Sequence, residues 1–396
     1  MNLKKDNLIR FINIFLFILI FAIRSFTDAI YVSKGIDSNI WVNSKYIVLI
    51  IAIIWGFFLL KYKKDKKIFI KELTNVSVVV IIFIMITLLL IVYSGNFYSG
   101  TIEEFIKLIL PIVYVFIVLN TFSFKDIYKS MSITLIVSII GYIIEIGTSN
   151  FNLANIATMN FWGSYSPFES SMSCGVAIAL CVFFTYYNKN KIFKYLSLIF
   201  VIFTFKRLFI VFAIMLLILP KFIDINKAIK GKYITIAKIF FIVATILYYI
   251  FLSPSSSGLF EKIMGTSQVE FTMGRSSFLR TLENSDFISS GLGSTTQAIG
   301  RGLEMDLIKI YLELGIIGLI TFVLGYWNCA GNKVYTFIYM TFQFFNMLTS
   351  HSLTSSFDWI LAFLIIGCIS YKTNNQEFQK NKERVKIYEK CGNNNS

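Results

Sequence analysis

Five cations lie at two points of the chain where an anionic ligand could bind. Lys206 and Arg207 are adjacent between two apolar runs, and Arg275, Arg280 and Arg301 share one polar segment. Guanidinium groups match the oxygens of a phosphate in pairs, so these residues are candidate ligands for a phosphate or diphosphate. Alternatively, Lys206 and Arg207 snorkel to the headgroup level and cap two helices.

Glycines accompany the three arginines, in the order Gly274-Arg275, Gly291-Leu292-Gly293-Ser294 and Arg301-Gly302. Glycine turns allow a close approach of the backbone and can aim successive N–H groups at an anion. The alternative is that the arginines pair with acidic residues of the same segment. These are Glu270, Glu283, Asp286 and Glu304.

Acidic residues and a histidine are the candidates for proton transfer. Glu304 and Asp306 stand at the start of an apolar run, where either carboxylate could act as a base. His351 is the single histidine, and its pKa near neutrality suits the same role, although it could also be a structural hydrogen-bonded group. Asp306, Lys309 and Glu313 are spaced to pair along one helix face, either lining a polar cavity or forming a structural ion ladder.

Long apolar runs must carry these residues. Tyr46–Leu60, Val76–Val92, Ile234–Leu252 and Phe357–Ile369 are almost uninterrupted Ile, Leu, Val and Phe. Runs of about 17 or more such residues can cross about 30 Å of hydrocarbon as helices. Because period-two alternation is absent, we predict an all-α polytopic integral membrane protein. The expected crossings, about twelve, centre near residues 19, 53, 84, 111, 137, 178, 199, 215, 243, 316, 341 and 363.

The distribution of charge predicts an orientation. Most of the 37 Lys and Arg residues fall near the N-terminus, in alternate connections and in the tail, so both termini are expected in the cytoplasm. Lys206, Arg207 and one large loop, residues 253–306 between crossings nine and ten, are then outside. We predict one transmembrane domain over 1–371 and a disordered, basic cytoplasmic tail over 372–396.

Composition excludes several classes of function. The net charge of +15 lies mainly in the connections, where anionic membrane lipids account for it, so no nucleic-acid partner is expected. The five cysteines show neither a pairing pattern nor metal-ligand spacing. We therefore predict no disulfide framework, no metal site and no cofactor.

The order of these motifs resembles the Wzy-type polysaccharide polymerases and the related O-antigen ligases. The matching motifs, within about residues 200–320, are Lys206-Arg207, Gly274-Arg275, Gly291-Leu292-Gly293-Ser294, and Glu313 with Gly315-Ile316-Ile317-Gly318. The resemblance implies a glycosyltransferase of the bacterial plasma membrane. It would join undecaprenyl-pyrophosphate-linked repeat units into a capsule, O-antigen or other exopolysaccharide on the outer face. A chain-length regulator and a flippase are the partners that such a pathway implies.

In that reaction the arginines, with Lys206, would stabilise the leaving diphosphate without a metal. Asp306 or Glu304 would be the base, with His351 as the further candidate, and a single displacement would invert the anomeric carbon. Ligases tend to have a His-Asn-like pair shortly before the Gly-x-x-Gly helix, whereas this chain has Glu304-Met305-Asp306, which favours a polymerase. A ligase, or a lipid-linked oligosaccharide flippase of a different class, remains the alternative.

Overall fold

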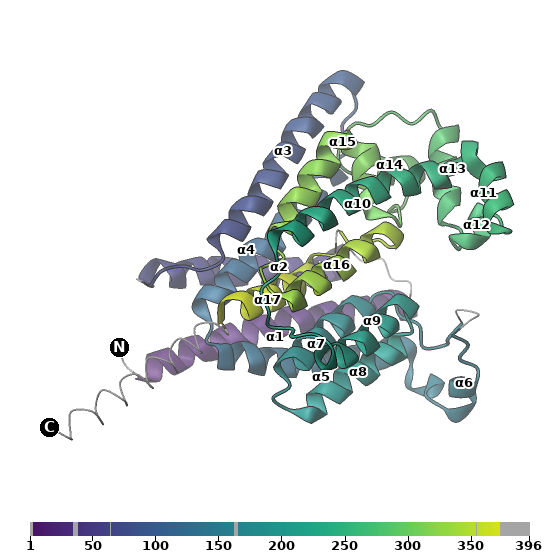
Figure 1. The fold of residues 1–396 in the computed structure, drawn as a ribbon. Coiled ribbons are helices and arrows are strands. Elements are labelled where there is room, and N and C mark those ends of the chain that lie inside the picture. The colour runs from purple at the N-terminus through teal and green to yellow at the C-terminus, as the bar shows by residue number, and fades with distance from the viewer. Residues whose placement is uncertain (1–2, 35–38, 64, 162–164, 354, 373–396) are drawn as a thin grey trace. The chain divides into compact units, whose positions relative to one another are not determined.

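Apolar helices dominate the architecture (Figure 1). The computed structural model describes residues 3–34, 39–63, 65–161, 165–353 and 355–372. Helices make up 78% of the chain, and these described ranges contain no β-strand. The predicted all-α class is therefore confirmed, as expected for segments whose backbone groups must pair internally in lipid. The predicted tail, apart from Lys372, lies outside the described residues.

Every predicted crossing centre falls within a helix. These helices are α1 (Leu3–Lys34), α2 (Asn39–Tyr62), α3 (Ile70–Ser94), α4 (Gly100–Thr121), α5 (Phe124–Ile146), α7 (Cys174–Tyr187), α8 (Lys191–Thr204), α9 (Arg207–Ile218), α10 (Gly231–Leu252), α15 (Asp306–Trp327), α16 (Val334–Thr349) and α17 (Ser356–Gly367). Among the described residues, six helices are long and apolar enough to cross a membrane, namely α1, α2, α3, α5, α10 and α15. The membrane class is thus supported, while twelve crossings stays a prediction.

Five of the other six helices are too short to meet that criterion. α7, α8, α9, α16 and α17 have only 12 to 16 residues. At 1.5 Å per residue they span at most about 24 Å, less than the hydrocarbon core. α4 has 22 residues, with Glu103, Glu104 and Lys107 near its start and Pro111 inside it.

The chain forms two compact units. Unit 1 comprises Met1–Phe69, Tyr114–Ile225 and Ile360–Ser396, and unit 2 comprises Ile70–Val113 and Asn226–Trp359. Each unit is therefore assembled from segments that are far apart in the sequence.

In unit 1, α1 and α5 pack side by side and run in the same direction (Figure 1). Arg10 of α1 pairs with Asp126 of α5, 116 residues later. Fifteen residues further along both helices, Gly141 packs on Ser25, again 116 residues apart. The register is therefore constant over about 22 Å, at 1.5 Å per residue.

In unit 2, α15 packs against α3, α10 and α16 (Figure 1). Gly325 of α15 allows close contact with α3, because a Cβ there would lie 2.1 Å from a methyl group of Val79. α15 is also broken at Gly315, whose φ of 68° and ψ of −171° are not helical. The Ser289 hydroxyl donates to the carbonyl of Glu313, a group that an unbroken helix would have paired internally.

The predicted loop at 253–306 is largely helical. It contains a 3₁₀ turn at Pro254–Ser256, α11 (Ser257–Met264), α12 (Gln268–Phe271), α13 (Arg275–Asn284) and α14 (Ser294–Ile299). Its small apolar core joins residues of α10 and α15. The core consists of Leu252, Phe260, Leu279, Leu303, Met305 and Ile308.

Phe271 and Leu282 of this segment lie on two separate helices, α12 and α13. Met273 and Gly274 have left-handed φ values of 51° and 89°, which end α12 and delay the start of α13 to Arg275. Leu282 is buried, whereas Phe271 is 47% exposed.

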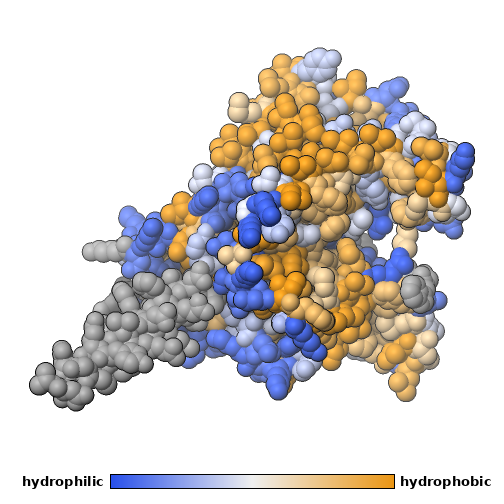
Figure 2. Space-filling view, viewed as in Figure 1, coloured by the Kyte–Doolittle hydropathy of each residue, from blue (hydrophilic) through white to orange (hydrophobic). Residues whose placement is uncertain are grey.

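The surface is strongly apolar where helices are expected to meet lipid. Figure 2 shows apolar side chains gathered over α3 and α10. Leu89 and Val92 of α3, and Ile236 and Leu247 of α10, are among the large exposed hydrophobic residues. Apolar faces of this extent on helices of spanning length are typical of contact with a bilayer.

The contact between α1 and α5 predicts the effect of Gly141→Ala. A Cβ at Gly141 would lie 2.6 Å from that of Ser25, so the helices must separate. We expect the free energy of unfolding in detergent to fall by about 1–2 kcal/mol. Gly231→Ala is the control, because Gly231 begins a helix with nothing within 4 Å of the added methyl. Equal effects of the two substitutions would contradict this packing.

Candidate functional site

The first half of α15 carries three charged side chains into the interior of unit 2. Asp306, Lys309 and Glu313 each have 0% exposure. They lie in a segment long and apolar enough to span a membrane. A charge in such a place is costly unless it is paired. Their spacing would allow pairing within α15, but each side chain forms hydrogen bonds with another element.

Asp306 binds the segment that follows α16. Its carboxylate lies 3.0 Å from Nδ1 of His351 and accepts hydrogen bonds from the backbone N–H of Leu353, at 2.6 Å, and of Ser352. Because a carboxylate only accepts, the proton of this His351 contact resides on Nδ1. The second ring nitrogen, Nε2, is then the one that can accept a proton.

The surroundings of His351 suit proton transfer. About a third of its side chain is exposed. A Cβ on Gly302 would lie 3.0 Å from Nε2, so the glycine leaves room beside that nitrogen. Burial lowers the pKa of His351, but the charge of Asp306 and its hydrogen bond raise it by more, so the pKa lies above its ordinary value. The arrangement of carboxylate and imidazole is that of an oriented general base.

Lys309 pairs with α4. Its Nζ lies 2.7 Å from Oε1 of Glu104, whose side chain is 12% exposed. Glu104 was not among the residues singled out from the sequence. The available signal was a carboxylate inside an apolar run, which must find a cation or a polar cavity.

Glu313 holds the Gly-Leu-Gly-Ser segment. It accepts hydrogen bonds from the N–H groups of Gly293, at 2.9 Å, and Thr295, at 3.0 Å, and from the Thr295 hydroxyl. Leu292 of that segment is also bound to α3 and α4, through Thr87 and Thr101. The glycine turn does aim N–H groups at an anion, but the anion is the chain's own carboxylate.

The arginines gather on Glu304. Nε of Arg275 donates to Oε2 at 3.2 Å, and a terminal nitrogen of Arg301 donates to Oε1 at 2.8 Å. Of the acidic partners considered from the sequence, Glu304 is thus the one used by both. Arg301 also lies over the ring of Phe278, 4.6 Å from its centre. Arg280, on α13, is exposed and forms no ion pair with a described residue.

Lys206 and Arg207 belong to unit 1, whereas the other candidate residues belong to unit 2. As predicted, the two cations form the turn of a helical hairpin. Phe205 closes α8 in the left-handed conformation, and Arg207 is the first residue of α9. Lys206 pairs with Glu169 at 2.9 Å.

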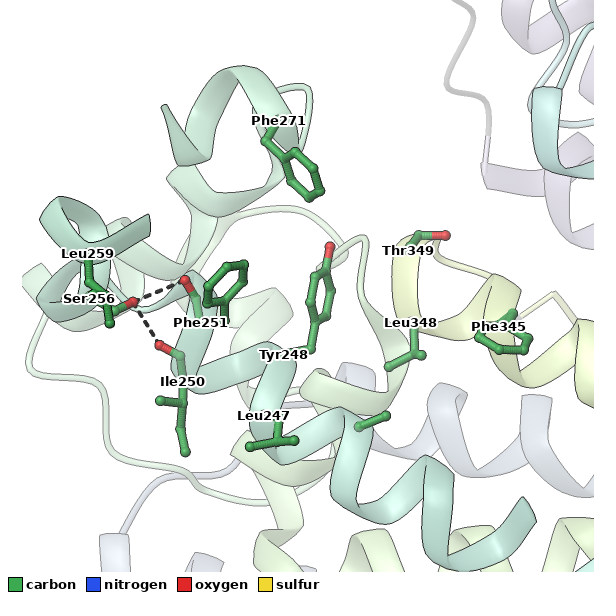
Figure 3. A pocket seen from close by; sticks show the side chains of 11 residues that line it. Leu247, Tyr248, Ile250, Phe251, Ser256, Leu259, Phe271, Phe345, Leu348 and Thr349 are labelled. Carbon is green, nitrogen blue, oxygen red and sulfur yellow. Dashed lines mark hydrogen bonds between the residues drawn. The ribbon is translucent and has the colours of Figure 1, made fainter. Parts of the chain in front are cut away.

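An apolar groove of about 680 Å³ adjoins this region of unit 2 (Figure 3). Its walls come from the end of α10, from α11 and α12, and from the end of α16. Tyr248 points into the space between Phe251, Phe271 and Leu348. Thr349, at one rim, stands two residues before His351. The groove therefore offers an apolar surface, and its rim residue Thr349 is close to His351 along the chain.

Comparisons of the chain with protein families, with curated proteins and with solved structures find no match.

The burial of the Lys309–Glu104 pair predicts different consequences for two neighbouring carboxylates. Glu104→Gln leaves a fully buried Lys309 without its direct partner, so the free energy of unfolding should fall by about 3 kcal/mol. Glu103→Gln removes a pair with Lys107 in which Glu103 is 62% exposed, and the loss should stay below about 1 kcal/mol. Denaturant unfolding in detergent measures both. Similar losses for the two variants would show that the buried pair contributes no more to the free energy of unfolding than the exposed pair.

Proposed function

We propose that this protein is a membrane glycosyltransferase that polymerises oligosaccharide repeat units carried on undecaprenyl pyrophosphate. The observation that supports it best is the oriented pair of Asp306 and His351 beside the arginines that share Glu304. A base and a cluster of cations are the two things that attack on a glycosyl diphosphate needs. The outer face of the bacterial plasma membrane is the proposed place of the reaction.

His351 is the proposed base, in preference to the two carboxylates. Asp306 already accepts several hydrogen bonds, and Glu304 is held by two arginines, so both carboxylates are engaged by groups of the protein itself. Nε2 of His351 would take the proton from the acceptor hydroxyl. Asp306 would keep the other nitrogen protonated and stabilise the imidazolium that forms.

The proposed displacement has one bond forming and one breaking. The acceptor oxygen bonds to the anomeric carbon while the bond from that carbon to the diphosphate oxygen breaks. The diphosphate leaves with the electron pair, and the anomeric configuration inverts. Arg275 and Arg301 would meet the growing negative charge by exchanging part of their contact with Glu304 for the diphosphate.

The groove of Figure 3 would hold the isoprenoid tail of the carrier. Its lining is almost wholly hydrocarbon, and its rim is close in sequence to His351. Arg280 remains a proposed ligand of the glycan or the diphosphate, because it is exposed on α13. Lys206 and Arg207 remain proposed ligands of a phosphate group.

One observation favours the alternative function of a ligase. The sequence motif before the Gly-x-x-Gly helix lacks a histidine, but His351 reaches Asp306 from a segment 45 residues away. Purified protein given only a synthetic undecaprenyl-pyrophosphate repeat unit distinguishes the possibilities. A polymerase converts it into a ladder of products on a gel. A ligase transfers glycan only when its separate acceptor is added, and a flippase makes no product.

The proposed base predicts the effects of His351→Gln and Asp306→Asn on ladder formation. Loss of a general base should lower the rate by about 10²–10⁴-fold for His351→Gln. The base form of His351 is lost as pH falls through its pKa, which Asp306 raises. In Asp306→Asn that cause is gone, so the acid limb of the pH–rate profile should move to lower pH. An unchanged limb would mean that Asp306 does not act through His351.

The proposed role of the arginines predicts that Arg275→Gln lowers the rate by about tenfold or more, since a charge-assisted hydrogen bond to the leaving group is lost. The control is Lys262→Gln, which removes one exposed cation from α11 of the same segment. Initial rates of the ladder assay compare the two. Activity of Arg275→Gln at the level of the control would exclude this arginine from the reaction.

A further inference from the structure

Unit 1 contains a cavity of about 770 Å³ that is lined mainly by residues of α1 and α5. One end is polar, with Asn7 and Arg10 from α1 and Lys125 and Lys129 from α5. The other end is apolar, with Ile14 and Ile18 of α1, Ile133 of α5 and Phe193 of α8. The cavity therefore changes from charged to apolar along its length.

The charged end has an excess of positive charge. Asp126 balances Arg10 and holds it through two hydrogen bonds, of 3.2 and 3.0 Å. Asp126 also accepts from Ser123, so its oxygens are occupied. Lys125 and Lys129 are exposed, and neither pairs with a described acidic residue. Two lysines lie beside the half-exposed side chain of Arg10, whose guanidinium is held by Asp126, and together they form a site that favours an anion such as a phosphate.

The parallel course of the two helices gives the apolar end its direction. Residue numbers rise from the charged end on both α1 and α5, so both helices enter the hydrocarbon region together. Eleven residues separate Asn7 from Ile18, which corresponds to about 16 Å of helix. One leaflet has about 15 Å of hydrocarbon, half of the total of about 30 Å. The length of the cavity and its change from charged to apolar thus match a lipid headgroup and the acyl chains beneath it.

We propose that this cavity binds one anionic phospholipid of the surrounding membrane, with its phosphate at Arg10, Lys125 and Lys129 and an acyl chain along Ile14 and Ile18. A free phosphate would leave the apolar half of the cavity without a ligand. Phe11 and Phe15, which line the cavity, are 66% and 51% exposed, so this wall is open to the bilayer, where phospholipids are the abundant amphiphile. The site is separate from the residues of the proposed function, which it does not require.

Titration of the detergent-purified, full-length protein with dioleoylphosphatidylglycerol, followed by native mass spectrometry, tests the proposal. We expect one tightly bound lipid and much weaker binding of dioleoylphosphatidylcholine, which has no net charge. In Lys125→Gln/Lys129→Gln the apparent Kd for phosphatidylglycerol should rise by about 30-fold. Lys61→Gln/Lys66→Gln is the matched control, because it removes two exposed lysines of unit 1 outside this cavity and should leave the Kd within about twofold.

Ile14→Trp separates a built site from diffuse attraction. The larger ring fills the apolar part of the cavity without changing any charge, so phosphatidylglycerol binding should also weaken by about tenfold or more. The proposal is overturned if Ile14→Trp binds as the natural protein does, or if the control double variant loses as much affinity as Lys125→Gln/Lys129→Gln. It is also overturned if undecaprenyl phosphate binds this cavity more tightly than phosphatidylglycerol.

Discussion

The arrangement of unit 2 depends on the burial of charge in one apolar helix. Asp306, Lys309 and Glu313 have no exposure to solvent, so each must find its partner inside the protein. The partners come from three other places, namely the segment after α16, α4, and the glycine segment before α15. The hydrogen bonds and the ion pair of one helix thereby hold together segments that are far apart in the sequence.

The same requirement explains why the candidate residues differ in what they can do. Asp306 and Glu313 are buried and accept several hydrogen bonds each, through which they orient His351 and the glycine segment. His351 is partly exposed and meets Asp306 through Nδ1. The candidate site therefore combines buried polar groups with a partly exposed imidazole at its edge.

The two units use charge in different ways. In unit 2 the charged groups in the first half of α15 are buried and paired within the protein. In the α1–α5 groove of unit 1, one guanidinium is fixed by Asp126 while Lys125 and Lys129 remain exposed. Charge in excess beside an apolar wall is suited to a ligand that is itself amphiphilic. A membrane protein of this kind can therefore separate the groups that shape its site from those that meet lipid.

The sequence by itself determined the all-α membrane class and the spacing of the charged residues, because both depend on the local period of a helix and on run length. The sequence also predicted that Lys206 lies between two helices, and it offered Glu304 as one of four acidic residues that could pair with the arginines. Only the tertiary structure decided that Lys309 pairs with Glu104, 205 residues away, and that Asp306 meets His351. Helical periodicity says which residues share a face, whereas the partner of that face is set by the packing of distant segments.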